Sequence, residues 1–303
     1  MAININPATT TQVVINLARK NQEKLADVST QIASGFKHND YKGFAEDGAV
    51  QNLISFSSTV KSTQKFIDTN ELTLGRINAQ DLAISQLQDI SSQISNLIAQ
   101  RRNSASGGDL PITTEANAIL DSISGKLNVR YDGRYLFSGT KTNALPVTNI
   151  KSSNLNTDNT ANSTYYNGDS NRPVAKADDS LEVTYGVTAD EDGFKQLIAA
   201  VHLLIEGHNS DDDDVLGEAM TMANSAVDNI ALSRAVVVSA KETLTKTNAS
   251  LQSVNLLISE NLNDISNTDI VQATTRMSEL QATIQATFLS FTRLNELRLS
   301  NFL

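Results

Sequence analysis

The sequence predicts a mainly α-helical protein in which long antiparallel coiled-coil helices from both termini flank a small β-rich central insert. Three observations predict this class. Hydrophobic residues make up 40% of the 303 residues but aromatic residues only 5%, without tryptophan, which suits a narrow aliphatic seam between rods. Residues 218–303 contain neither glycine nor proline, the residues most hostile to a helix interior. Residues 131–193 instead hold five of the six tyrosines.

A heptad repeat predicts the long C-terminal helix. One apolar column returns every seven residues at Leu216, Ala223, Ile230, Val237, Leu244, Leu251, Ile258 and Ile265. The column three residues further on is mostly small: Ala219, Ala226, Ser233, Ala240, Thr247 and Val254. This repeat predicts a supercoiled helix of about 50 residues, or about 75 Å, that a partner helix can approach closely. Residues 266–269 offer helix-capping side chains, and a second seam begins at Ile270.

The N-terminal part shows the same kind of pattern. An apolar face in steps of four and three residues comprises Val14, Ala18, Asn21, Leu25, Val28 and Ile32. Gly35 then provides the usual C-terminal stop. A second helix is predicted from near Val50 and a third over about 114–130, separated by a loop over 103–111. Gly75, inside the second helix, indicates either a kink or a close contact.

Residues 131–193 predict the insert. Asp132-Gly133 and Asn167-Gly168 are hairpin-type turn pairs, and residues 181–185 alternate like a strand. Helix returns over Phe194 to Ile205. The expected divisions are an N-terminal assembly helix and loop (1–50), rod helices (51–130), the insert (131–193), further rod helices (194–265) and a C-terminal assembly helix (266–303).

The sequence offers no constellation for catalysis. It has no cysteine, which excludes thiol nucleophiles and Cys-ligated zinc. Three isolated histidines, His38, His202 and His208, lack metal-ligand spacing. The acidic run 211–214 lacks the alternation of a calcium loop, and it is expected to favour the start of the next helix through the helix dipole. We therefore expect no enzyme, no cofactor and no metal site.

Charge and hydropathy narrow the partners. The net charge of −10 argues against nucleic acid, whose phosphates need a basic footprint. No run of about 18 apolar residues appears, so no membrane span is expected. The N-terminus lacks the basic and apolar regions of an ordinary signal peptide. The sequence therefore indicates either a cytoplasmic protein or export by a route that reads no cleaved signal.

Several segments resemble the bacterial flagellin superfamily. Residues 25–35 read Leu-Ala-Asp-Val-Ser-Thr-Gln-Ile-Ala-Ser-Gly and resemble the end of the first flagellin helix. Residues 47–50 resemble the acidic-alanine start of the second helix, and residues 269–303 resemble the closing helix. The segment from His38 to Glu46 departs from the family pattern.

Two further segments resemble the hook-associated protein 3 branch of this family, whose members join hook and filament. Residues 132–140 resemble its Gly-x-Tyr-Leu-Phe-x-Gly turn, with the motif residues Gly133, Tyr135, Leu136, Phe137 and Gly139. The endings Phe288–Leu294 and Ser300–Leu303 are also similar to that branch.

The resemblance implies a structural subunit of the bacterial flagellum that links hook to filament by helical self-assembly after type III export. The implied partners are copies of the chain in a ring or tube, a hook-associated adaptor protein, flagellin, the flagellar export apparatus and an export chaperone. The implied location is the secreted, extracellular flagellum. The terminal helices would fold on assembly into a coiled-coil wall, while the insert faces outward.

Physical reasoning agrees with folding on assembly, because a long exposed seam offsets its conformational entropy only when neighbours bury it. We expect the inter-helix and subunit contacts at Val14, Leu25, Val28, Ile32, Met277, Leu280, Ile284, Phe291 and Leu294.

Three alternatives remain open at this point. The chain could be a flagellin that forms the filament itself. It could be a cell-surface module that binds glycan or protein through the insert tyrosines. The heptads could also form an ordinary intramolecular bundle with no partner.

Overall fold

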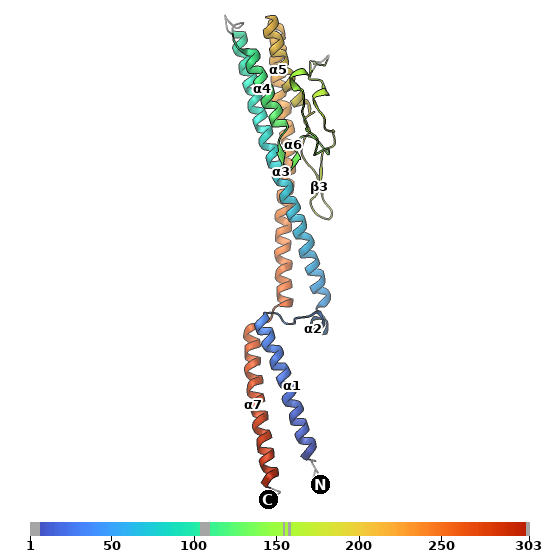
Figure 1. The fold of residues 1–303 in the computed structure, drawn as a ribbon, viewed down its shortest axis with the longest axis vertical. Coiled ribbons are helices and arrows are strands. Elements are labelled where there is room, and N and C mark those ends of the chain that lie inside the picture. Colours follow the sequence, from blue (N-terminus) through green and yellow to red (C-terminus); the bar gives the residue numbers. More distant parts are fainter. Residues whose placement is uncertain (1–6, 104–109, 154, 157–158, 301–303) are drawn as a thin grey trace. The chain divides into compact units, whose positions relative to one another are not determined.

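The computed structural model describes residues 7–103, 110–153, 155–156 and 159–300, with side chains from residue 12 to residue 293 within those ranges. The chain divides into two compact units (Figure 1). Unit 1 comprises residues 1–61 and 255–303, and unit 2 comprises residues 62–254. None of the helices in the described ranges is long and apolar enough to cross a membrane.

Unit 2 is a helical bundle with the insert packed on it (Figure 1). Its helices are α4 (Ile112–Leu127), α5 (Asp192–Ser210) and most of α3 (Val50–Asn103) and α6 (Asp213–Ser266). All four helices contribute to one core cluster of buried aliphatic side chains. The mainly α-helical class predicted from the sequence is confirmed.

The heptad column of α6 forms one wall of this core. Leu216, Ala223, Ile230, Val237 and Leu244 are all buried. The small companion column is buried at Ala219, Ala226, Ser233 and Ala240, so neighbouring helices approach closely there. The helix spans 54 residues, as the repeat predicted.

Small residues also bring α5 against α6. A Cβ added at Gly193 would lie 2.7 Å from the backbone nitrogen of Ile230 and 2.8 Å from the carbonyl carbon of Asn229. Beside this contact, Asn229 Nδ2 donates to Gln196 Oε1 over 2.7 Å. Glycine at 193 is therefore required by packing, because neither α6 backbone atom can move without shifting the helix.

The insert contains two small antiparallel sheets. β1 (Arg130–Tyr131) pairs with β2 (Arg134–Tyr135), and β3 (Val174–Lys176) pairs with β4 (Glu182–Thr184). Asp132 and Gly133 have φ of 50° and 75°, the two positive values that a type I′ hairpin needs. Both the Asp132-Gly133 turn and the strand near residue 183 are confirmed. Two 3₁₀ turns, η2 (Ile150–Ser152) and η3 (Ser163–Tyr165), lie between the sheets in the sequence.

The prediction of a hairpin turn at Asn167-Gly168 is wrong. Neither residue has a positive φ, and no strand of the two sheets borders them. Asn167 Nδ2 instead donates to Thr148 Oγ1 over 2.8 Å. A Cβ at Gly168 would lie 2.6 Å from the carbonyl oxygen of Ser138, so the glycine permits a close backbone approach.

Polar side chains of α3 hold the insert against the bundle. Gln80 is buried, and its Nε2 donates to the carbonyl oxygens of Leu136 and Val187 over 2.9 and 2.8 Å. Asn70 Nδ2 donates to the carbonyl oxygen of Ala177 over 2.9 Å. These bonds satisfy insert backbone that could not otherwise be buried.

Aromatic side chains of the insert also contribute to its packing against the bundle. Phe137 meets Phe194 of α5 edge to face, with centroids 5.9 Å apart. The buried Tyr165 donates its hydroxyl to the carbonyl oxygen of Ala189 over 2.8 Å, and burial raises its pKa.

The structure decides two further predictions, the end of the third helix and the role of Gly75. The third helix ends at Leu127 rather than near residue 130, because Arg130 pairs in β1. Gly75 marks a close contact inside α3, which is continuous from Val50 to Asn103. A Cβ at Gly75 would overlap the Tyr131 hydroxyl.

The acidic run begins α6, as expected. Asp212 Oδ1 accepts from the backbone nitrogens of Asp214 and Val215 over 2.9 and 3.3 Å. The run also pairs with the end of α3, which the sequence did not predict. Arg101 pairs with Asp211, and Arg102 binds both carboxylate oxygens of Asp213 at 2.9 and 3.0 Å, lowering the pKa of Asp213.

Two glycine substitutions test the packing of unit 2. Gly193→Ala is expected to lower the free energy of unfolding by about 1–3 kcal/mol, because the added methyl group forces α5 and α6 apart. Gly125→Ala, on α4, is the matched control, since nothing lies within 4 Å of its added Cβ. It should raise the free energy of unfolding by about 0.4–1 kcal/mol. Urea denaturation followed by circular dichroism measures both, and equal effects would contradict the close α5–α6 contact.

Candidate assembly interface

Unit 1 is built on two long helices, α1 (Pro7–Ser34) and α7 (Ile270–Ser300), which lie side by side (Figure 1). The short α2 (Tyr41–Glu46) follows α1 in the sequence. Val14 and Phe291 line one groove and Val28 and Leu280 another, so residue numbers rise along one helix as they fall along the other. α1 and α7 therefore form an antiparallel pair, as predicted for the two termini.

Backbone bonds fasten the end of α1 to the start of α7. Gly35, with φ of 77°, terminates α1 and accepts at its carbonyl oxygen from the nitrogen of Thr268 over 2.8 Å. The nitrogen of Lys37 donates to the carbonyl oxygen of Ser266 over 2.8 Å. Asp269 Oδ1 caps α7 by accepting from the nitrogen of Gln272 over 3.1 Å. The predicted helix stop and restart are therefore present, and the structure joins them.

The residues proposed for assembly lie at or near the α1–α7 seam. Val28 is buried, with 5% of its surface exposed. The other described members are half-buried: Val14, Leu25, Ile32, Met277, Leu280, Ile284 and Phe291. Leu294 lies in α7, but its side chain is outside the described residues. The pair thus brings these side chains toward one another and leaves most of them partly exposed.

Ile270 does not belong to the seam, although the sequence placed it there. It is 54% exposed, whereas Ala273 is buried. α1 ends at Ser34, and the residues that follow it meet the start of α7 through backbone hydrogen bonds, from Thr268 N to Gly35 O and from Lys37 N to Ser266 O. Gly35 has no side chain, so this contact leaves Ile270 exposed.

Asn21 occupies the middle of the α1 face. It is 7% exposed, and its Nδ2 is buried without a hydrogen-bond partner among the described residues. A buried donor left unpaired costs about 1–3 kcal/mol. The buried face of α1 thus includes an amide nitrogen that no described residue satisfies.

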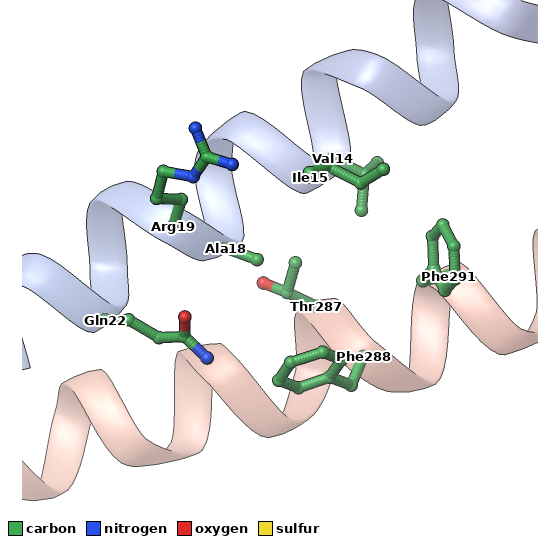
Figure 2. Close-up of a pocket in the computed structure, with 8 residues that line it drawn as sticks. All are labelled: Val14, Ile15, Ala18, Arg19, Gln22, Thr287, Phe288 and Phe291. Atoms are coloured by element: carbon green, nitrogen blue, oxygen red, sulfur yellow. The ribbon is translucent and has the colours of Figure 1, made fainter.

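Two open grooves flank Asn21 along the helix pair. Figure 2 shows the first groove, of about 250 Å³, with Val14 and Ile15 of α1 opposite Phe291 of α7, and with Phe288 also lining it. Ala18, Arg19, Gln22 and Thr287 complete its lining. The second groove, of about 450 Å³, is lined by Lys24, Asp27, Val28, Gln31, Arg276, Glu279, Leu280 and Thr283. Protein interiors are normally close-packed, so the pair leaves unfilled space on both sides of Asn21.

Exposed apolar side chains gather on other faces of the same helices. Val13 and Leu17 of α1 and Val271 and Leu289 of α7 are exposed. Leu256 and Leu257, near the end of α6 in unit 1, are exposed as well. The seam columns did not identify these residues. Their sequence signal is an apolar residue outside the heptad phase.

The predicted turn-motif residues lie in unit 2 and have packing roles. Phe137 and Gly139 are buried, whereas Tyr135 and Leu136 are partly buried and Gly133 is exposed in the hairpin turn. Gly139 has φ of 69°, and a Cβ there would lie 2.9 Å from the carbonyl oxygen of Asn171. The motif therefore shapes the join between insert and bundle.

The histidines make structural contacts. His38 Nε2 lies 2.6 Å from Asp47 Oδ2. His202 Nε2 lies 3.0 Å from the carbonyl oxygen of Ile150, and burial lowers the pKa of His202. Within the ranges that the structure describes, no group of three or more His, Asp or Glu side chains could hold a metal ion.

Comparison with known proteins locates a family region. Residues 5–142 match the bacterial flagellin N-terminal helical region, which confirms the flagellin resemblance for this part of the chain. No curated protein matches the sequence.

The chain is also similar to several solved protein structures. The chain is similar to a putative flagellar hook-associated protein from Vibrio parahaemolyticus, with 14% identity and a TM-score of 0.52 over 71% of this chain and 96% of that one. FlgL of Bacillus cereus is similar at 18% identity and a TM-score of 0.45, over 67% and 98% of the two chains. FlgL of Xanthomonas campestris is similar at 15% identity and a TM-score of 0.45, over 68% of this chain and 99% of that one. The chain therefore shares its fold with the Vibrio protein.

Replacing Asn21 tests the unsatisfied seam. Asn21→Leu is expected to stabilise the α1–α7 pair by about 1–3 kcal/mol, since it removes a buried amide without a partner. Hydrogen exchange of the unassembled protein, followed by mass spectrometry on peptides from residues 12–34, should slow accordingly. Lys20→Leu, at an exposed position of the same helix, should leave exchange unchanged. Faster exchange in Asn21→Leu would mean that Asn21 is satisfied within the pair.

Proposed function

We propose that this chain, whose residues 5–142 carry a bacterial flagellin N-terminal helical region, is a structural subunit of the bacterial flagellum. It acts by self-assembly and by association with hook and filament proteins, and its place is the extracellular part of the flagellum. The proposed role is structural, and no residue is assigned a catalytic role.

The incomplete α1–α7 pair is the observation that carries this proposal. Two helices alone bury only a narrow stripe, and here both grooves beside Asn21 stay open. Phe288 and Leu289 of α7 remain 50% and 64% exposed. Burying one such side chain contributes about 1.5–3 kcal/mol, so neighbouring copies that fill the grooves and cover these faces would stabilise one another strongly.

We place the chain at the hook–filament junction. The turn at residues 132–140 and the ending at 288–294 support this position, as does the name of the similar Vibrio protein. Flagellin of the filament itself is the second candidate within the same class. Both candidates use the same seam residues, so they differ in location and not in the physics of assembly.

The route to this location is part of the proposal. Export through the flagellar type III channel requires an extended chain, and terminal helices that complete their burial only in the assembly suit that requirement. The export apparatus and an export chaperone are therefore proposed partners, together with a hook-associated adaptor protein and flagellin. No nucleic acid or membrane partner is proposed.

The packing of three insert tyrosines argues against the alternative of a surface module that binds glycan or protein through these rings. Tyr165 is fully buried, and the hydroxyl of Tyr166 donates to the carbonyl oxygen of Asp169 over 2.7 Å. Tyr135 is covered by the Arg130 guanidinium, 4.8 Å from its ring centroid. These rings pack inside the insert instead of forming an exposed aromatic platform.

A charge placed in the seam should block assembly. Leu280→Asp puts a carboxylate into the α1–α7 groove, where burial disfavours the charged form. We expect loss of sedimentable assemblies in ultracentrifugation and at least a tenfold loss of swimming in cells that carry the variant. Circular dichroism and protease digestion should show unit 2 still folded.

The control at this position is Leu280→Met, which keeps volume and apolar character. It should assemble and support swimming nearly as the parent chain does. Normal assembly of Leu280→Asp would show that the proposed seam is not an assembly contact.

Immunogold labelling of intact cells tests the location, using antibody raised against residues 140–195. Label confined to the base of each filament is expected for the junction subunit. Label along the whole filament would instead identify a filament flagellin. Absence of flagellar label would overturn the proposed function in both forms.

A further inference from the structure

A small cavity in unit 2 lies where α3 meets the two hairpins of the insert. Its volume is about 40 Å³, and Arg76, Gln80, Arg134, Thr142 and Tyr185 are among the residues that line it. This is a small cavity, suited to a small polar group rather than to a large organic ligand.

Arg76 enters this cavity with its bonding capacity unfilled. Its side chain is only 11% exposed, and its Nε is buried without a hydrogen-bond partner among the described residues. Its sole ion pair in those residues is a long one, with Nη2 3.4 Å from Asp132 Oδ2. Buried charges are normally paired and hydrogen-bonded, so the Nε of this guanidinium lacks the acceptor expected for it.

The surroundings carry an excess of positive charge. Arg134 also lines the cavity and has no ion-pair partner within the described ranges. Arg130, at the start of the same hairpin, donates to the carbonyl oxygen of Gly133 over 2.6 Å and covers the Tyr135 ring. Two arginines thus line the cavity, and the described residues give them one ion pair between them, that of Arg76 with Asp132.

Glycine backbone keeps the cavity open. Gly139 and Gly186 both line it, with φ of 69° and 78°. A Cβ added at Gly186 would lie 3.0 Å from Gln80 Oε1, and so would narrow the space in front of Arg76. The cavity therefore depends on backbone conformations that favour glycine.

We propose that this pocket binds a single oxyanion, a carboxylate or phosphate group, through the guanidinium groups of Arg76 and Arg134. A planar guanidinium matches such a group with paired, charge-assisted N–H···O bonds. Thr142 and Tyr185, which also line the cavity, carry hydroxyl groups that could donate to the same anion. A bound oxyanion would tie α3 to the β1–β2 hairpin and rigidify the join between bundle and insert.

Two sources could supply the oxyanion. One is an acidic side chain of a second copy of this chain, which has 34 Asp and Glu residues. The other is a small free anion such as acetate or inorganic phosphate. Both present the same chemistry to the pocket, and both can be probed on the unassembled full-length chain.

The test follows the side-chain Nε–Hε signal of Arg76 by nuclear magnetic resonance in the ¹⁵N-labelled full-length chain. The signal is assigned by its loss in Arg76→Lys. Sodium acetate and sodium phosphate are titrated separately at constant ionic strength against sodium chloride, and the protein alone is diluted over a hundredfold range. A saturable shift with either added anion identifies a free-anion site, and a shift with protein concentration alone identifies the carboxylate of a second copy.

Arg134→Gln should raise the half-saturating concentration at least fivefold in whichever arm responds, since it removes one of the two guanidinium groups. Lys65→Gln removes an equal charge from an exposed position on the same helix and should leave the titration unchanged. No shift in any arm, or a shift that Arg134→Gln leaves unaltered, would overturn the proposal.

Discussion

Burial of the α6 heptad column is the interaction on which the rest of the structure depends. Leu216 through Leu244 pack at seven-residue intervals, and the small companion residues let neighbouring helices lie close enough to exclude water. Aliphatic burial of about 25 cal/mol per Å² accumulates along such a column. It holds α3, α4 and α5 in one core, and only on that support do the short strands of the insert persist, since isolated two-stranded hairpins are marginal in water.

The same physics leaves the terminal helices unfinished. α1 and α7 have only each other within unit 1 for most of their length, and a two-helix contact covers one stripe of each. Val28 is buried, but Asn21 is unsatisfied and the flanking grooves are open. For the flagellar subunit proposed above, this division would let unit 2 be stable before the terminal pair is complete.

The insert depends on α3 for its backbone hydrogen bonds. Gln80 and Asn70 sit among aliphatic residues of the α3 stripe, yet their amides bind carbonyl oxygens of segments more than fifty residues away in sequence. Such buried polar contacts fix one arrangement of an irregular segment. Arg76, between them on the helix, differs because its Nε lacks an acceptor among the described residues, although its Nη2 pairs with Asp132.

The sequence by itself determined the helices, their ends at Gly35 and Asp269, the Asp132-Gly133 hairpin and the apolar faces, because periodicity, capping and turn chemistry are local. Tertiary structure alone decided that Ile270 stays exposed, that Asn167-Gly168 serves close packing, and that Arg76 lines a cavity. Those outcomes depend on which segment, distant in the sequence, packs against each residue. A local sequence pattern does not specify that packing partner.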